Sequence, residues 1–153
     1  MKRDSRLSRM LHVLLHMAQF DAPVTSELIA RMLATNPVVV RRTMAGLRDA
    51  GLVRSEKGHG GGWSLACNLA EVSLLDIYRA VGEPTIFAIG NATESRGCLV
   101  EQAVNGALDS ALRDAGALLA ARLRRISLAD LAADFGERFA AHKLMHTECP
   151  NVA

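Results

Sequence analysis

The amino-acid sequence predicts a mainly α-helical fold with one β-hairpin and one long helix near the C-terminus. Ala, Leu, Val and Arg dominate the 153 residues, a composition that favours helices, and only 4% of the residues are aromatic. Apolar residues recur at helical spacing over residues 5–50, and a glycine-rich segment separates two short alternating stretches directly afterwards. An uninterrupted helical pattern from Leu99 to about Arg124 predicts the long helix.

Two short helices are expected at the N-terminus, followed by a tight turn. The first runs from about Ser5 to Gln19 along an apolar stripe, and Pro23 belongs to the break after it. The second runs from Ser26 to about Leu33. It follows Thr25, whose hydroxyl is suited to accept a hydrogen bond from the free backbone N–H groups at a helix start. Only residues 34–36 separate this helix from the next.

The third helix carries the clearest start and stop signals. Asn36 is a preferred N-cap, and Pro37 suits the first helical position because its missing N–H has no partner there. Gly51 suits the left-handed conformation that ends many helices. Between them an apolar stripe at i, i+4 and i+7 consists of Val40, Met44 and Leu47. The arginines lie on other faces of the helix: Arg41, Arg42 and Arg48. Two helices joined by a tight turn, the second with outward arginines, form the helix-turn-helix pattern.

A hairpin is expected directly after the third helix. Residues 52–57 alternate as a strand does, residues 58–62 (GHGGG) form a flexible tip, and residues 63–66 return as a second strand. Trp63 is expected to anchor this hairpin in the core. Glycines at the tip would let the backbone approach phosphates closely. A glycine-rich loop alone is a weak signal, but the order helix, helix, helix, hairpin predicts a winged helix-turn-helix with a two-stranded β wing.

Charge is distributed unevenly along the chain. Residues 1–66 hold 10 Lys or Arg against 5 Asp or Glu (net +5), whereas residues 67–153 hold 8 against 11 (net −3). A basic N-terminal part suits a polyanionic partner such as nucleic acid. Five excess charges equally suit an ordinary solvated surface, so charge alone does not decide between the two interpretations.

Three segments resemble the Rrf2 (Rrf-two) family of winged helix-turn-helix transcriptional regulators. They are residues 35–42 (TNPVVVRR), 47–53 (LRDAGLV) and 58–66 (GHGGGWSLA). Residues 72–81 (VSLLDIYRAV) are similar to the family's segment after the wing, and the resemblance is thinner beyond Gly82. The resemblance implies a cytoplasmic homodimer whose long C-terminal helices cross, with two wings and two recognition helices facing double-stranded DNA.

The long helix supports dimerisation on its own pattern. It would be about 39 Å long at ~1.5 Å per residue, and it is too apolar to stand alone beside a small winged helix. Burial against a second copy is the favoured interpretation, and packing back on the chain's own N-terminal part is the alternative. The expected dimer contacts are Val104, Leu108, Leu112 and Leu119.

The chain is therefore divided into three parts. Residues 1–82 form the DNA-binding domain, residues 83–97 a linker, and residues 98–153 the dimerisation helix and a C-terminal helix. Ser127 with Asp130 three residues later is a capping box that starts this last helix.

The three cysteines, Cys67, Cys98 and Cys149, are too few and too scattered for a disulfide framework, which indicates a reducing compartment. Family members that bind an iron–sulfur cluster use three closely spaced cysteines at the start of the dimer helix, where this chain has only Cys98. The resemblance therefore implies a member without the cluster, and we expect no cofactor. Cys98 could be a redox-sensing thiol, because a helix start and Arg96 both favour the thiolate. The favoured alternative is a small apolar residue in the dimer core.

Other candidate ligand residues are weaker. His12 with His16 and His142 with His146 have the i, i+4 spacing that can bind a metal. The sequence dictates no third ligand, so solvated histidines are favoured and no metal site is expected. Tyr78 is either a core residue or the lip of a pocket for an unknown small-molecule effector.

The sequence as a whole predicts a sequence-specific DNA-binding transcriptional regulator that acts as a homodimeric repressor. The alternative is a winged-helix protein–protein interaction module, which would show apolar or acidic residues where the third helix has arginines. No catalytic constellation is recognisable, so an enzyme is not expected. No apolar run approaches the roughly 20 residues that cross a bilayer. The expected DNA-binding residues are Thr35, Asn36, Val38, Arg41, Arg42, Arg48, His59, Gly60 and Gly61.

Overall fold

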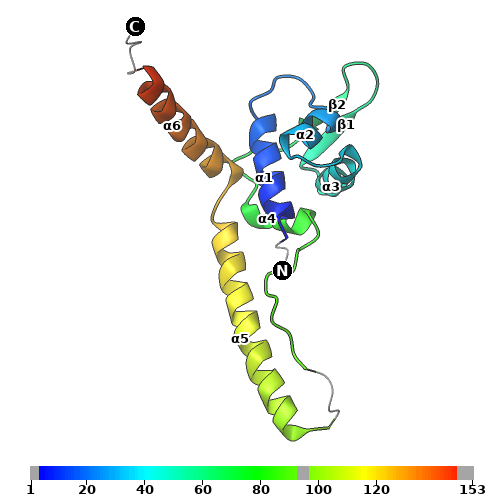
Figure 1. Ribbon diagram of the computed structural model, residues 1–153, viewed down its shortest axis with the longest axis vertical. Helices are drawn as coiled ribbons and strands as arrows, with labels where there is room; N and C mark the ends of the chain where they lie inside the picture. Colours follow the sequence, from blue (N-terminus) through cyan, green and yellow to red (C-terminus); the bar gives the residue numbers. More distant parts are fainter. Residues whose placement is uncertain (1–3, 93–96, 148–153) are drawn as a thin grey trace.

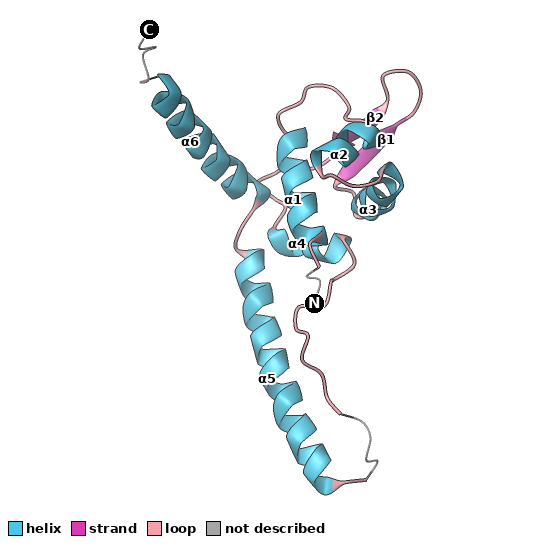
Figure 2. Cartoon of the chain, in the orientation of Figure 1, coloured by secondary structure: helices cyan, strands magenta, loops and turns pink. Residues whose placement is uncertain are grey.

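The computed structural model describes residues 4–92 and 97–147, the last five of them by backbone only. The elements are α1 (Arg6–Met17), α2 (Ser26–Met32), α3 (Pro37–Asp49), β1 (Val53–Glu56), β2 (Gly62–Leu65), α4 (Leu74–Ala80), α5 (Leu99–Arg124) and α6 (Leu128–Thr147). Elements α1 to α4 with the hairpin form a rounded head, and α5 and α6 extend along one side of it (Figure 1). Figure 2 shows the two strands as one hairpin whose loop projects from the head. The predicted winged helix-turn-helix with a long C-terminal helix is confirmed.

The core of the head is built from the predicted apolar stripes. Val40, Met44 and Leu47 of α3 are buried, as their i, i+4, i+7 spacing predicts. They pack with residues of α1, α2 and the hairpin, which include Met10, Leu14, Met17, Ile29, Val53 and Trp63. Val13 is fully buried, although it is not part of the apolar stripe that the sequence predicts for the first helix. That stripe consists of Leu7, Met10, Leu11, Leu14, Leu15 and Ala18. The buried face of α1 is therefore wider than the sequence pattern indicates.

Side-chain caps fix where the helices of the head begin. The Thr25 hydroxyl accepts a hydrogen bond from the Leu28 N–H (3.2 Å), and the Asn36 side-chain oxygen accepts one from the Val38 N–H (2.8 Å). Both caps were predicted. Helix α4 begins with a capping box that the sequence analysis missed, in which Ser73 and Asp76 bond to each other's backbone N–H groups.

Trp63 anchors the hairpin in the head as predicted. Its side chain is buried, and its Nε1–H donates to the Ser26 hydroxyl (2.9 Å). Its backbone also pairs with Val24 in both directions, with N···O distances of 2.8 and 2.9 Å. The register of the hairpin, with Val53 opposite Leu65, places Trp63 opposite Ser55. The wing is thus held by the segment before α2 as well as by its own strand pairing.

The junction between α5 and α6 is inserted into the head. Leu128 is fully buried in the core, and its backbone N–H donates to Val72 (2.9 Å), while Leu74 donates to Ile126 (2.9 Å). The predicted capping box at Ser127 and Asp130 is present, with bonds of 2.8 and 3.0 Å. The C-terminal part therefore supplies a core residue to the head.

Helix α5 has the predicted bounds, but unlike the helices of the head it is not packed into a core. None of its 26 residues, all of which are described, is buried. The linker lies along one flank, where Asn91 bonds to the Asp109 carboxylate (2.7 Å) and Asn105 bonds to the Ala92 carbonyl (2.9 Å). Within the described residues, no helix is both long and apolar enough to cross a membrane.

Candidate DNA-binding site

The three arginines of α3 differ in their partners. The Arg41 guanidinium forms an ion pair with Glu27 of α2 (2.8 Å), and Arg48 forms one with its neighbour Asp49 (3.2 Å). Arg42 is exposed and, among the residues that the structure describes, makes no hydrogen bond or ion pair. Arg42 is therefore the arginine of α3 whose charge is fully available to a polyanion.

Glu27 is a site residue that the sequence analysis missed. Hydrogen bonds from its own backbone N–H and from Arg41 hold the pKa of the Glu27 carboxyl below its usual value, so it is charged at neutral pH. Sequence reasoning placed Glu27 only as a favourable charge in the first turn of α2. The ion pair spans 14 positions and depends on the angle at which α2 and α3 cross, which sequence spacing does not give.

The capped start of α3 lies on the surface of the head. Asn36 and Val38 are exposed, and Thr35 is half-buried. Ala34 takes a left-handed backbone conformation (φ +49°), which lets the turn close within a few residues. The positive end of the helix dipole lies here, and such an end attracts phosphate groups.

The wing tip has a tighter geometry than its glycine content alone predicts. A Cβ atom on Gly61 would collide with the carbonyl oxygen of Glu56, and the Gly61 N–H donates to Gly58 (3.0 Å). Gly60 has φ +77° with open space around it. Gly61 is thus required by the hairpin turn itself, while His59 and Gly60 form the exposed tip.

These residues share one side of the molecule. Figure 1 shows α3 and the hairpin on the side of the head that faces away from α5 and α6. Helix α3 packs on both α2 and β1, so α3 and the wing are held by the same core. The structure therefore brings the predicted α3 and wing residues onto the same part of the head.

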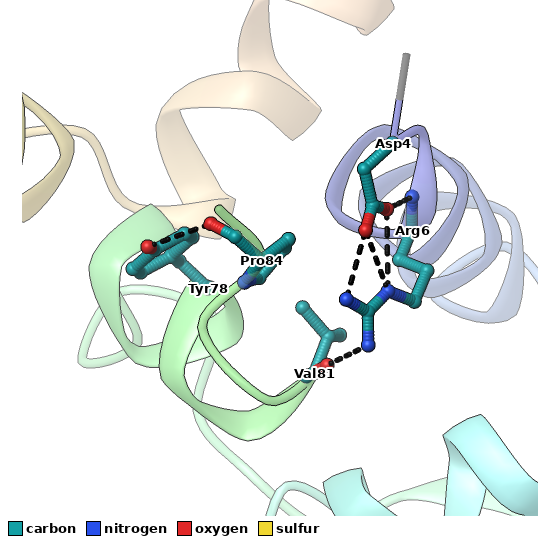
Figure 3. Close-up of polar contacts among 5 residues, drawn as sticks. All are labelled: Asp4, Arg6, Tyr78, Val81 and Pro84. Carbon is teal, nitrogen blue, oxygen red and sulfur yellow. Dashed lines mark hydrogen bonds and ion pairs between the residues drawn. The ribbon is translucent and has the colours of Figure 1, made fainter. Parts of the chain in front are cut away.

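A hollow of about 650 Å³ lies where the head, the linker and α5 meet. Figure 3 shows Arg6 of α1 between Asp4 and the carbonyl oxygen of Val81, with bonds of 2.8 and 3.2 Å. Tyr78 donates to the Pro84 carbonyl (2.9 Å) and is one of the residues that line the hollow. The Asp4 carboxylate raises the pKa of Arg6, and Arg6 lowers the pKa of Asp4, so both are charged.

The predicted dimer contacts divide into two groups. Val104 and Leu108 are exposed, together with Leu99, Val100 and Leu118. Leu112 and Leu119 are half-buried, and Leu119 lines the hollow beside the linker. One flank of α5 is therefore partly covered within the chain, and the free apolar face is the one that bears Val104.

The fold and the order of the elements agree with the relatives of the chain. The family model Rrf2, described as an iron-dependent transcriptional regulator, matches residues 3–134. The chain belongs to the Rrf2 family. YwnA of Bacillus subtilis (strain 168), provisionally named an HTH-type transcriptional regulator, is 34% identical over 129 residues, which cover 84% of this chain and 95% of YwnA. This Rrf2-family chain is accordingly a transcriptional regulator, and its relatives are named as regulators and not as enzymes.

Solved structures share the architecture of this Rrf2-family regulator. A crystal structure from Lactobacillus plantarum, provisionally named a transcriptional regulator, has a TM-score of 0.74 at 26% identity and covers 93% of this chain and 98% of its own. IscR of T. potens has a TM-score of 0.66 at 23% identity, with 90% of each chain covered. At that identity the likeness to IscR supports the fold alone.

The residues present do not fit the family's iron–sulfur cluster. A cluster is normally held by four ligands, mostly thiolates, and Cys98 is the one cysteine near the start of α5, where Ala92 and Val104 offer no ligand atom. Cys67 is half-buried in the head, and burial raises the pKa of its thiol, which disfavours the ligating thiolate. Cys149 and Arg96 lie outside the described residues. Cys98 itself is exposed in the single chain.

Proposed function

We propose that this Rrf2-family regulator is a homodimeric repressor that binds DNA through α3 and the wing. The observation that carries the proposal is Arg42, an exposed arginine with no partner in the described residues, on a helix whose capped N-terminus lies on the same surface. An arginine that is already free of carboxylates loses no ion pair when it binds a base edge or a phosphate. Arg41 would first have to leave Glu27.

The exposed apolar face of α5 supports the homodimer. Val100 and Leu118 are 72% and 74% exposed, and they lie five turns apart on the same side of the helix. An isologous contact between two copies of this face would bury both. The division into a DNA-binding domain, a linker and a dimerisation part is proposed on the same ground, with Leu128 as the point where the dimerisation part joins the head.

The hollow at Arg6 and Tyr78 is the proposed place for an effector. It touches α1, α4, the linker and α5, so a molecule bound there would contact both the DNA-binding head and the dimer helix. Apolar walls with one guanidinium suit a small organic acid that competes with Asp4 for Arg6. A thermal-shift screen of such acids should show hits that the Arg6→Gln variant loses, and equal hits in both proteins would contradict this placement.

A gel-shift titration against the DNA upstream of its own gene tests the main proposal. We expect Arg42→Ala to weaken binding at least about tenfold, because a bidentate arginine–guanine pair is worth roughly 1–3 kcal/mol. Arg41→Ala should weaken DNA binding less, because Arg41 must break its ion pair with Glu27 before it can contact DNA. The contact that the variant loses is therefore worth less than the contact of Arg42. Both variants should keep the melting temperature of the parent, and binding should fall steeply with salt as counterions are released.

The partner-docking alternative predicts a different outcome. If the Arg41→Ala/Arg42→Ala double variant, folded and dimeric, binds the DNA as tightly as the parent at the same salt, α3 does not enter the groove. The relatives named as HTH-type regulators favour DNA over a protein partner.

A further inference from the structure

The two histidines of α1 face each other on the surface of the head. The Nε2 atoms of His12 and His16 are 2.9 Å apart, and the ring centroids are 4.7 Å apart at an angle of 30°. Residues four apart on a helix share a face, but most such pairs are solvated independently. At this separation the two Nε2 atoms can form an N–H···N hydrogen bond, whose donor and acceptor depend on the tautomers of the two rings. The two ring nitrogens are therefore held close enough to act on one ligand together.

A hollow of about 350 Å³ opens beside this pair, between α1 and α6. Its lining consists of Leu15, Gln19 and Phe135 besides the two histidines. Gln19 lies in the turn directly after α1 and lines the same hollow, and its side chain can offer an amide oxygen. Within the described residues, no group of three or more His, Cys, Asp or Glu side chains could hold a metal ion. Any ion at this pair would therefore complete its coordination with water or with Gln19.

From this geometry we infer that His12 and His16 form a binding site for a divalent first-row transition-metal ion. When the ion binds, the ring that carries its proton on Nε2 transfers it through solvent to its own Nδ1, so both rings stay neutral and each Nε2 lone pair becomes a ligand. Imidazole is a preferred ligand for this class of ion, whereas magnesium and calcium prefer oxygen. The site is distinct from α3 and the wing, so the inference does not depend on the proposed DNA binding.

The separation of the two nitrogens indicates which ions fit best. With metal–nitrogen bonds of about 2.0–2.1 Å, nitrogens 2.9 Å apart subtend an angle of about 90° at the metal. A right angle matches neighbouring positions in the square-planar or tetragonal geometry of Cu²⁺ and Ni²⁺. Tetrahedral Zn²⁺ needs the nitrogens about 3.3 Å apart at the same bond length. We therefore expect the order of affinity Cu²⁺ over Ni²⁺ over Zn²⁺ at this site.

Titration calorimetry of the full chain without a histidine tag, with NiCl₂ as the probe, tests the site. We expect one ion per chain, and at least a tenfold loss of affinity in the His12→Asn/His16→Asn double variant. His59→Asn and His142→Asn are the matched controls, one on the wing and one on α6, and both should bind as the parent does. Circular dichroism should show the same helix content in all four proteins.

Electron paramagnetic resonance with one equivalent of Cu²⁺ gives a second readout. Nitrogen hyperfine structure from two imidazoles is expected in the parent, and from one in the His16→Asn variant. The inference is overturned if the double variant binds Ni²⁺ as tightly as the parent, or if His142→Asn removes the binding. A spectrum without imidazole nitrogen would overturn it as well.

Discussion

The head and α5 place the same kinds of side chain in opposite environments. In the head, Leu14, Ile29 and Leu47 are fully buried by neighbours that come from other helices of the same chain. In α5, Leu99, Val100 and Leu118 are each more than 70% exposed. Removing apolar surface from water is worth roughly 25 cal/mol per Å², so the head gains this energy within one chain and α5 does not.

This difference separates two sources of stability. The head is closed by contacts that do not depend on protein concentration, including Leu128 at the start of α6. Nothing in the described part of the chain covers the apolar face of α5 that bears Val104. If a second copy or another partner covers it, the contribution of this face to stability should rise with protein concentration. Substitutions in the two regions should therefore be distinguishable by concentration dependence.

The largest effect is expected from a charge on the free face of α5. Val104→Asp would leave an unpaired carboxylate in the proposed dimer contact, at a cost of roughly 3–5 kcal/mol. Light scattering should give about 33 kDa for the parent, twice the 16.4 kDa chain, and a smaller mass for the variant. Gln102→Asp is the control, because two residues turn the helix by about 200° and place Gln102 on the opposite side. If the parent is folded and monomeric at micromolar protein concentration, the dimer proposal is wrong.

A cavity in the head should lower the free energy of unfolding slightly less than the charge on α5 does. Its effect should not depend on protein concentration. Leu14→Ala removes a fully buried side chain, and such changes cost about 2–5 kcal/mol. We expect a lower melting temperature at every protein concentration in calorimetry, with the dimeric mass kept. Leu118→Ala is the matched substitution in α5, and its effect should shrink on dilution. If both variants lose the same amount of stability at every protein concentration, the head and α5 do not differ in their source of stability.

Local signals in the sequence were sufficient for most of the fold. The cap at Asn36, the stripe through Met44 and the capping box at Ser127 depend only on neighbours within one or two helical turns. The bounds of α5 follow from the same kind of pattern. The box at Ser73 was equally local, with Asp76 three residues on, and could have been found by the same rule.

Contacts between segments that are far apart in the sequence could not be predicted from such local patterns. The burial of Leu128 in the head and the ion pair of Glu27 with Arg41 depend on how helices cross, which no spacing along the chain records. The convergence of His12 and His16 depends on side-chain rotamers, so the same i, i+4 spacing is compatible with solvated rings. For the wing, the sequence indicated a flexible glycine tip, whereas the close approach of Gly61 to Glu56 is a property of the folded turn.

A wing substitution tests whether the glycines act through the fold or through DNA contact. Gly61→Ala forces a Cβ atom against the Glu56 carbonyl, and overpacking of this kind costs about 1–3 kcal/mol. We expect both a lower melting temperature and weaker DNA binding in this variant. His59→Ala should leave the melting temperature unchanged and weaken binding only slightly, because backbone N–H groups of the tip remain. If Gly61→Ala weakens binding with unchanged stability, the glycine acts on DNA directly.

The smallest effect concerns the acid dependence of the α4 cap, which belongs to the head. Hydrogen bonds from the Ser73 hydroxyl and backbone N–H lower the pKa of Asp76. A carboxyl whose pKa is lower in the folded state adds stability above its unfolded pKa, about 3.9, and this stability is lost as the pH falls through the folded value. Asp76→Asn should therefore lower the free energy of unfolding at pH 7, by less than about 1 kcal/mol because solvent screens this exposed carboxylate. The difference from the parent should narrow below pH 4.

Urea unfolding at pH 7 and at pH 3 measures this narrowing directly. Asp21→Asn is the control, because Asp21 lies in an exposed loop and makes no hydrogen bond or ion pair among the described residues. The cap directly precedes Leu74, the first residue of α4, and the Leu74 N–H donates to the carbonyl of Ile126, two residues past the end of α5. Loss of the cap should thus loosen the point where α5 meets the head. If the free energy of unfolding differs between Asp76→Asn and the parent by the same amount at pH 7 and at pH 3, the carboxylate charge is not the source of the difference.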